Sequence, residues 1–216
     1  NATVAQTIFF FFFFQGDSKK ALVALCAAMV AIVIWATAAW VFGIPTSESH
    51  ALIAGLSGAA IALQNSIKGI NLGEWTKVFY GLLLSTFLGF SMGWIFVKMI
   101  ELICRKMDKR KTNEFFKKAQ IGGGAAMAFM HGAQDGQKFM GVFMLGMFLA
   151  QGNSTATEFT IPVWLMILCS LVMALGTSIG GYRIIKAVGM DMVKLNTYQG
   201  FAADLAGAGC ILLSSL

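Results

Sequence analysis

Long apolar runs, separated by short polar stretches, cover most of the chain. A helix rises 1.5 Å per residue, so about 20 apolar residues are needed to cross a hydrocarbon core of roughly 30 Å. Two of the runs contain no charged residue, one has Lys98 and Glu101 only near its end, and one carries a single acid, Asp204. The predicted membrane spans are residues 21–43, 78–103, 159–182 and 197–216.

Two further apolar segments are interrupted by polar residues. Residues 44–64 open with IPTSESH, and residues 119–150 hold the stretch HGAQDGQK between two apolar arms. The second pattern is typical of a discontinuous helix in a transporter. A helix can be interrupted at membrane depth only where the main chain is buried in protein or lines a cavity. Both segments therefore predict a cavity within a multi-helix bundle.

The composition places these runs in a membrane rather than in a soluble core. The chain is 57% hydrophobic and 12% charged, whereas a soluble domain is about 45–50% apolar and about 25% charged. We therefore predict an all-α, multi-pass integral protein of the cell membrane, with the lipid bilayer as its surroundings. The four cysteines are scattered without a CxxC pair, so neither a zinc site nor a disulfide framework is indicated, and no cofactor is expected.

The positive charge is concentrated in one loop. The net charge is +6, and residues 104–118 hold seven of the sixteen basic residues against two acids. A short basic loop between apolar runs indicates the cytoplasmic side. We predict that it links part of a first transmembrane half, residues 1–103, to part of a second half, residues 119–216. No aromatic residues are interleaved on a basic face, so nucleic acid is not an expected partner.

The same rule predicts a topology for the remaining segments. With the basic loop inside, Lys19, Lys20 and Arg183 fall inside, and the loop 151–158, which lacks Lys and Arg, falls outside. Every loop obeys the rule only if 44–64 enters and leaves on the outer side. We therefore expect 44–64 to form a re-entrant hairpin.

Asp135 is the candidate of greatest chemical interest, because it lies in the polar stretch of 119–150. An acid at the centre of a membrane helix costs about 2.5–3.5 kcal/mol on insertion scales, so it is kept where it binds a cation, a proton or a partner charge. Gln134, Gln137 and His131 occupy the same turn, which favours a binding site. The alternative is a structural ion pair with Lys138, three residues on.

The segment GIPTSESH offers the hydroxyls of Thr46, Ser47 and Ser49, with Pro45 leading into a helix. A helix N-terminus carries roughly half a positive charge together with free N–H groups. Hydroxyls beside such a terminus form an anion site without a buried basic residue. The alternative is an ordinary Ser/Thr cap of the helix.

An enzymatic reading finds little support. Ser49 and His50 are adjacent on one helix and point about 100° apart, so they do not pair readily with each other in a triad with Asp135. No GxSxG elbow is present, and GTSIGGYR lacks the ending of a phosphate-binding P-loop.

The chain starts with an unusual run of phenylalanines, Phe9–Phe14. A signal peptide would have a basic region before its apolar core, but no basic residue precedes this run. We therefore interpret this start as a cut or altered segment.

Two segments, GIPTSESHALIAGLSGAA and HGAQDGQKFMG, resemble the inorganic phosphate transporter family (PiT, Pho-4-like). That family has two copies each of a GxNDxxN-type and a GxPxSxTH-type signature, in halves of inverted topology. HGAQDGQK is similar to the second-half ND signature, and GIPTSESH to the first-half hydroxyl signature. Gln134 replaces the usual Asn, and Glu48 stands where a hydroxyl residue is common. The first-half ND signature and the second hydroxyl signature are missing, so the chain looks like the middle of a longer transporter.

The resemblance implies an inverted-repeat transporter that takes up inorganic phosphate by symport with Na⁺ or H⁺. Gln134, Asp135 and Gln137 would help to bind the coupling cation and phosphate, with a Na⁺ at Asp135, while Ser47, Ser49 and Thr46 would contact phosphate. A carrier or channel for another anion, such as sulfate, is the alternative, and a non-transporting membrane subunit is a third. A second copy of the chain, forming a homodimer, is a further expected partner.

Overall fold

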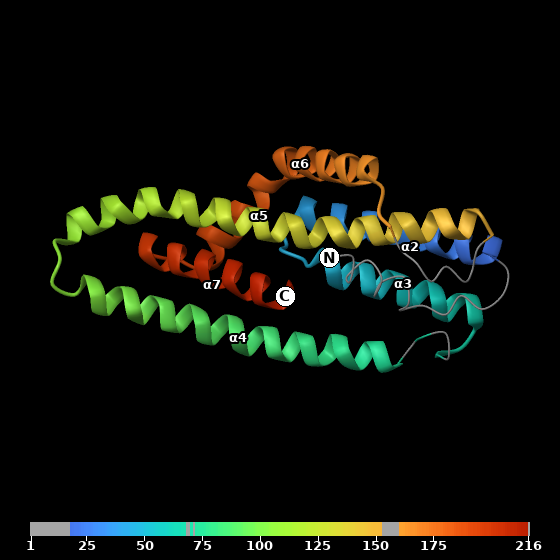
Figure 1. The fold of residues 1–216 in the computed structure, drawn as a ribbon, viewed down its shortest axis with the longest axis horizontal. Helices are drawn as coiled ribbons and strands as arrows, with labels where there is room; N and C mark the ends of the chain where they lie inside the picture. The colour runs from blue at the N-terminus through green and yellow to red at the C-terminus, as the bar shows by residue number, and fades with distance from the viewer. Residues whose placement is uncertain (1–17, 68–69, 71, 153–159, 216) are drawn as a thin grey trace. The chain divides into compact units, whose positions relative to one another are not determined.

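The structure, a computed structural model, shows an all-α protein, which confirms the predicted fold class (Figure 1). It describes residues 18–67, 70, 72–152 and 160–215. The run Phe9–Phe14 and most of the loop 151–158 lie outside the described residues. The helices are α2 (Ser18–Phe42), α3 (Glu48–Gln64), α4 (Leu72–Cys104), α5 (Lys109–Ala150), α6 (Val163–Lys186), the π-helical turn η2 (Ala187–Met192) and α7 (Thr197–Ser215).

Three of the predicted membrane spans are confirmed as helices. Within the described part of the chain, the segments Ser18–Phe42, Trp75–Cys104 and Val163–Met192 are long and apolar enough to cross a bilayer. The fourth predicted span forms the shorter helix α7, which carries Asp204. The helices therefore form where uninterrupted apolar length requires the main chain to satisfy its own hydrogen bonds.

The chain divides into two compact units that interleave along the sequence. The first unit takes its described residues from 1–76 and 135–191, and the second from 77–134 and 192–216. Helix α5 contributes to both, with its N-terminal part in the second unit and its C-terminal part in the first. These units do not coincide with the halves 1–103 and 119–216, which remain a prediction about transmembrane repeats.

Helix α5 corrects the expectation of a discontinuous helix at HGAQDGQK. It runs without interruption over 42 residues, from Lys109 to Ala150. The segment contains no proline, and a glycine such as Gly132 or Gly136 weakens a helix interior by only about 1 kcal/mol, which tertiary packing overcomes. The basic stretch 104–118 is likewise mostly helical, since α5 already begins at Lys109.

Helix α3 corrects the expectation of a re-entrant hairpin within 44–64. It is one helix of 17 residues, and the chain reverses before it, at Gly43 with φ of +67°. The hairpin is therefore formed by α2 and α3 together. Gly55 allows their close approach, since a Cβ at this position would lie 2.8 Å from Cγ1 of Ile32 on α2.

The first unit places the start of α2 beside the end of α5. A Cβ added to Gly146 would lie 3.6 Å from Cδ2 of Leu25, near the beginning of α2. Farther along the chain, the ring of Trp164 at the start of α6 meets Phe143 edge-on, with ring centroids 5.9 Å apart. The beginnings of α2 and α6 therefore lie at the same end of the unit.

At the other end of the first unit, α2 meets the C-terminal part of α6. The indole N–H of Trp40 donates to the main-chain oxygen of Gly180 at 3.0 Å, and the Arg183 guanidinium lies 5.7 Å from the centroid of the Trp40 ring. Helices α2 and α6 therefore run in the same general direction (Figure 1). The predicted topology, with Lys19 inside and the loop 151–158 outside, is incompatible with this arrangement, because the charge count could not reveal which helices are parallel.

In the second unit, a buried cluster joins α4, α5 and α7. Ile100, Phe116 and Ala202 form its centre, and the Phe116 ring lies 6.4 Å from the Tyr198 ring and 5.6 Å from the Phe201 ring. This packing holds the start of α5 against the start of α7.

Farther along the same two helices, Asp204 of α7 faces glycines of α5. A Cβ added to Gly123 would lie 3.4 Å from the Asp204 Cβ, and one added to Gly124 would lie 3.8 Å from its Oδ2. The acid therefore lies where the absence of side chains leaves room.

Candidate functional site

The two polar segments meet in the first unit through the side chain of Lys138. Its Nζ donates to Oδ1 of Asp135 at 2.7 Å and to Oγ of Ser49 at 2.6 Å. The charged side chains are 18% exposed for Lys138 and 15% exposed for Asp135. Ser49, Lys138 and Asp135 therefore form one partly buried group, here called the bridge cluster, although Ser49 and Lys138 are 89 residues apart.

Local sequence explains why these side chains converge. Residues three apart on a helix are surface neighbours, so α5 presents Asp135 and Lys138 side by side. Ser49 lies in the first turn of α3, whose N-terminus attracts negative charge. Glu48 precedes it and is close enough to Asp135 to feel the negative charge of that carboxylate. The neighbourhood thus combines two carboxyl groups, one ammonium group and a hydroxyl.

The other predicted hydroxyls, Thr46 and Ser47, directly precede α3 and have protein partners of their own. Oγ of Ser47 accepts a hydrogen bond from the His50 main-chain N–H at 3.4 Å and caps α3. Oγ1 of Thr46 accepts one from the indole N–H of Trp35 at 3.0 Å. The capping interpretation is therefore correct for Ser47. A hydroxyl that accepts in this way retains its own proton for donation, so capping and anion binding are compatible.

A cavity of about 600 Å³ lies between α2 and the start of α3 and is lined in part by Trp35, Thr46, Ser47 and His50. Its volume falls within the range of small-molecule sites. Ser49 belongs instead to the bridge cluster. The structure thus places Thr46 and Ser47 on a cavity and Ser49 beside Asp135.

Gln134 and Gln137 flank Asp135 on α5, and both are half-buried. Gln137 is one residue from Lys138, and Gln134 is one helical turn before it. Their carboxamides remain candidate ligands, as the sequence predicted. The polar segment therefore does present several oxygen-bearing side chains, even though the helix is not broken there.

A cation at this site would need oxygen ligands drawn mainly from side chains. Within the described residues, no group of three or more His, Cys, Asp or Glu side chains is arranged to hold a metal ion. The main-chain carbonyls of an unbroken α5 are used inside the helix. Asp135, Glu48 and the neighbouring amides and hydroxyls are therefore the groups available to a Na⁺ ion.

Sequence reasoning missed two contributors to this geometry. Lys138 was considered only as a partner of Asp135, and its bond to Ser49 depends on how α5 packs against α3. Trp35 was not singled out, because its distance of 11 residues from Thr46 becomes short only when α2 and α3 fold into a hairpin.

Over residues 1–216 the sequence matches the family described as "Phosphate transporter family". The chain belongs to this family. It is 37% identical over 208 residues to a probable low-affinity inorganic phosphate transporter of Bacillus subtilis, covering 96% of this chain and 62% of the relative. It is 35% identical over 189 residues to the similarly described protein of Mycobacterium leprae, covering 88% and 45%. The chain thus spans only part of the length of these relatives.

A solved structure described as "The sodium-dependent phosphate transporter" has the same fold. The TM-score is 0.85 at 20% identity, over 98% of this chain and 70% of that one. A sodium-dependent phosphate transporter of Toxoplasma gondii is 30% identical over 105 residues, covering 49% of this chain and 12% of the relative. The family resemblance seen in the two polar segments is confirmed, and the family is one of transporters rather than enzymes.

Proposed function

We propose that this phosphate transporter family member is a secondary active carrier of the cell membrane, which takes up inorganic phosphate together with a coupling cation. The observation that supports this most directly is the bond from Lys138 to both Ser49 and Asp135, because it joins the hydroxyl segment to the acidic segment. The Ser49 hydroxyl and the Asp135 carboxylate thereby share one basic partner.

The charges near the bridge cluster explain why a cation should accompany phosphate. With Glu48 and Asp135 ionised and Lys138 protonated, the three groups sum to one net negative charge. Two unit charges 4 Å apart interact by about 4 kcal/mol at an effective dielectric constant of about 20. Phosphate would therefore be repelled by this site until one bound cation neutralises it. The bound cation therefore favours the binding of phosphate.

Phosphate would be held by hydroxyls and by the start of α3. Thr46, Ser47 and Ser49 each accept a hydrogen bond from a protein N–H donor, which directs their remaining proton elsewhere. The first N–H groups of a helix have no partner inside the helix, so α3 adds main-chain donors and a favourable dipole. Lys138 supplies a formal positive charge within the same unit.

Na⁺ is the coupling ion that we favour, with Asp135 as its principal ligand and Gln134, Gln137 and Glu48 beside it. Two proteins similar to this chain are described as sodium-dependent. H⁺ is the alternative, and it would protonate one of the two carboxylates with the same effect on net charge. Transport would follow from rocking of structural repeats around the site. A homodimer remains a prediction.

Uptake of labelled phosphate into proteoliposomes that contain the full-length protein tests the proposal. A Na⁺ gradient at constant pH and a pH gradient without Na⁺ separate the two coupling ions, and excess sulfate tests the alternative anion. Asp135→Asn should abolish concentrative uptake while membrane insertion persists. The matched control is Glu114→Gln, which removes an exposed acid paired with Arg110. Near wild-type uptake by Asp135→Asn would show that Asp135 is only structural.

A further inference from the structure

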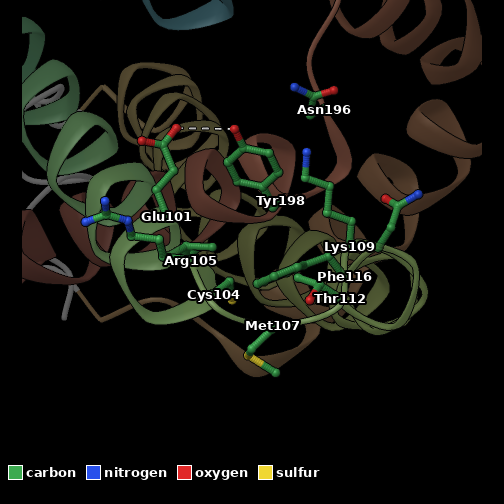
Figure 2. Close-up of a pocket in the computed structure, with 11 residues that line it drawn as sticks. Glu101, Cys104, Arg105, Met107, Lys109, Thr112, Phe116, Asn196 and Tyr198 are labelled. Atoms are coloured by element: carbon green, nitrogen blue, oxygen red, sulfur yellow. Dashed lines mark hydrogen bonds between the residues drawn. The ribbon is translucent and has the colours of Figure 1, made fainter.

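The second unit contains a cavity that the transport site does not use. Its volume is about 590 Å³, and it lies where the end of α4, the start of α5 and the start of α7 meet (Figure 2). Ile100 and Phe116, which are 8% and 5% exposed, form an apolar floor. Polar and charged side chains surround this floor, including Arg105, Lys109 and Asn196.

Two of the lining residues, Arg105 and Lys109, are cations. Among the described residues, neither Arg105 nor Lys109 forms an ion pair, whereas Lys98 pairs with Glu101 at 2.7 Å. Glu101 also accepts a hydrogen bond from the Tyr198 hydroxyl at 3.2 Å. The lining acid is therefore already neutralised, and the cavity keeps an excess of positive charge.

Asp108, which precedes α5 beside the cavity, is the nearest acid in the sequence to these two cations, but it is already engaged elsewhere. Oδ1 of Asp108 accepts hydrogen bonds from the main-chain N–H groups of Arg110 at 2.8 Å and Lys111 at 3.3 Å. Asp108 is thus engaged in capping α5 and does not line the cavity. In Figure 2, Lys109 extends toward Asn196 and Tyr198, and Arg105 lies on the Glu101 side of the Tyr198 ring. The two cations therefore line the cavity from opposite sides of the Tyr198 ring.

We propose that this cavity binds a phosphate-bearing anion. A guanidinium offers a planar fork of donors that matches phosphate oxygens, and an ammonium adds a point charge. Asn196 provides a neutral carboxamide donor, while the apolar floor accommodates a non-polar portion of the ligand. Two sources carry this chemistry: the headgroup of an anionic phospholipid, which basic pockets near membrane helices attract, and free inorganic phosphate.

Cys104 lines the cavity and gives a direct readout. The full-length protein with Cys104 as its sole cysteine is placed in nanodiscs, and its alkylation by N-ethylmaleimide, an uncharged reagent, is timed. One arm compares phosphatidylcholine alone with equal parts of phosphatidylcholine and phosphatidylglycerol, without phosphate. The other adds inorganic phosphate to phosphatidylcholine nanodiscs. At about ten times Kd, alkylation should slow roughly tenfold, because only the unoccupied fraction reacts.

Two double variants with equal charge change decide the outcome. Protection should be lost in Arg105→Gln/Lys109→Gln and kept in Lys117→Gln/Lys118→Gln, whose side chains do not line the cavity. Slowing by phosphatidylglycerol identifies a lipid, and slowing by phosphate alone identifies the free ion. No slowing in either arm, or equal slowing in both variants, would overturn the proposal. If the first variant does not fold, judged by the loss of a monodisperse peak in size-exclusion chromatography, single Lys109→Gln should weaken protection, and unchanged protection would refute the proposal. The result does not depend on how phosphate is transported.

Discussion

Replacing Lys138 by Met removes the ammonium group and keeps a side chain of similar length, so it isolates the energy of the bridge cluster. In the native chain, Nζ lies 2.7 Å from Asp135 Oδ1 and 2.6 Å from Ser49 Oγ, and both charged side chains are mostly buried. Lys138→Met leaves the Asp135 carboxylate without this partner and with Glu48 nearby. The protein should therefore unfold more easily.

The size of the effect follows from the burial. Breaking a fully buried ion pair costs about 3–5 kcal/mol, and losing a hydrogen bond to a charged group costs about 1.5–3 kcal/mol. The Lys138 and Asp135 side chains retain some contact with solvent, so we expect a loss of about 2–3 kcal/mol. For a chain of this size, 1 kcal/mol corresponds to about 2–4 °C, and Tm should fall by roughly 5–10 °C.

Thermal unfolding in detergent, followed by intrinsic fluorescence, measures this change, and the chain contains its own control. Lys98 and Glu101 have the same spacing and the same 2.7 Å contact, but they are 56% and 39% exposed. Lys98→Met should therefore lower Tm much less than Lys138→Met, because solvent screens an exposed pair. The double variant Asp135→Asn/Lys138→Met should lose less than the sum of its single changes. Equal shifts for Lys98→Met and Lys138→Met would refute the argument from burial.

Two further changes test the hydroxyl segment and the helix hairpin. Ser47→Ala/Ser49→Ala should weaken phosphate affinity by about 1–3 kcal/mol, the cost of leaving polar partners unsatisfied, as measured by concentration-dependent uptake. Unchanged affinity would exclude these hydroxyls as phosphate ligands. Gly55→Ala should lower Tm because the new Cβ would lie 2.8 Å from Cγ1 of Ile32, whereas Gly58→Ala meets nothing within 4 Å and should not lower it. A Gly55→Ala protein as stable as the Gly58→Ala control would show that the α2–α3 contact is loose.

The membrane helices could be predicted from the sequence because their length depends on bilayer thickness and on apolar composition alone. The spans 21–43 and 78–103 differ from α2 and α4 by a few residues at their ends, where polar flanks extend the helix beyond the apolar run. Local composition was sufficient to predict these helices, because their formation does not depend on packing against another segment.

The path of the chain through the polar segments could not be predicted in the same way. Polarity around Asp135 indicated a candidate site, but polarity does not determine main-chain geometry, and α5 remains helical. The Lys138–Ser49 bond and the common direction of α2 and α6 are tertiary facts. They depend on which faces pack together, and a single sequence contains no direct record of that choice.

The continuity of α5 has a mechanical consequence. The helix passes from the second unit to the first between Gln134 and Asp135, so one rigid rod belongs to both. Any rotation of one unit against the other must twist or bend this helix, and Gly132 and Gly136 lower its stiffness beside Asp135. The ion-binding candidate therefore lies between two glycines of the helix that joins the units. If a cation bound at Asp135 favours one curvature of this helix, then by reciprocity a change that stabilises that curvature raises cation affinity by the same free energy.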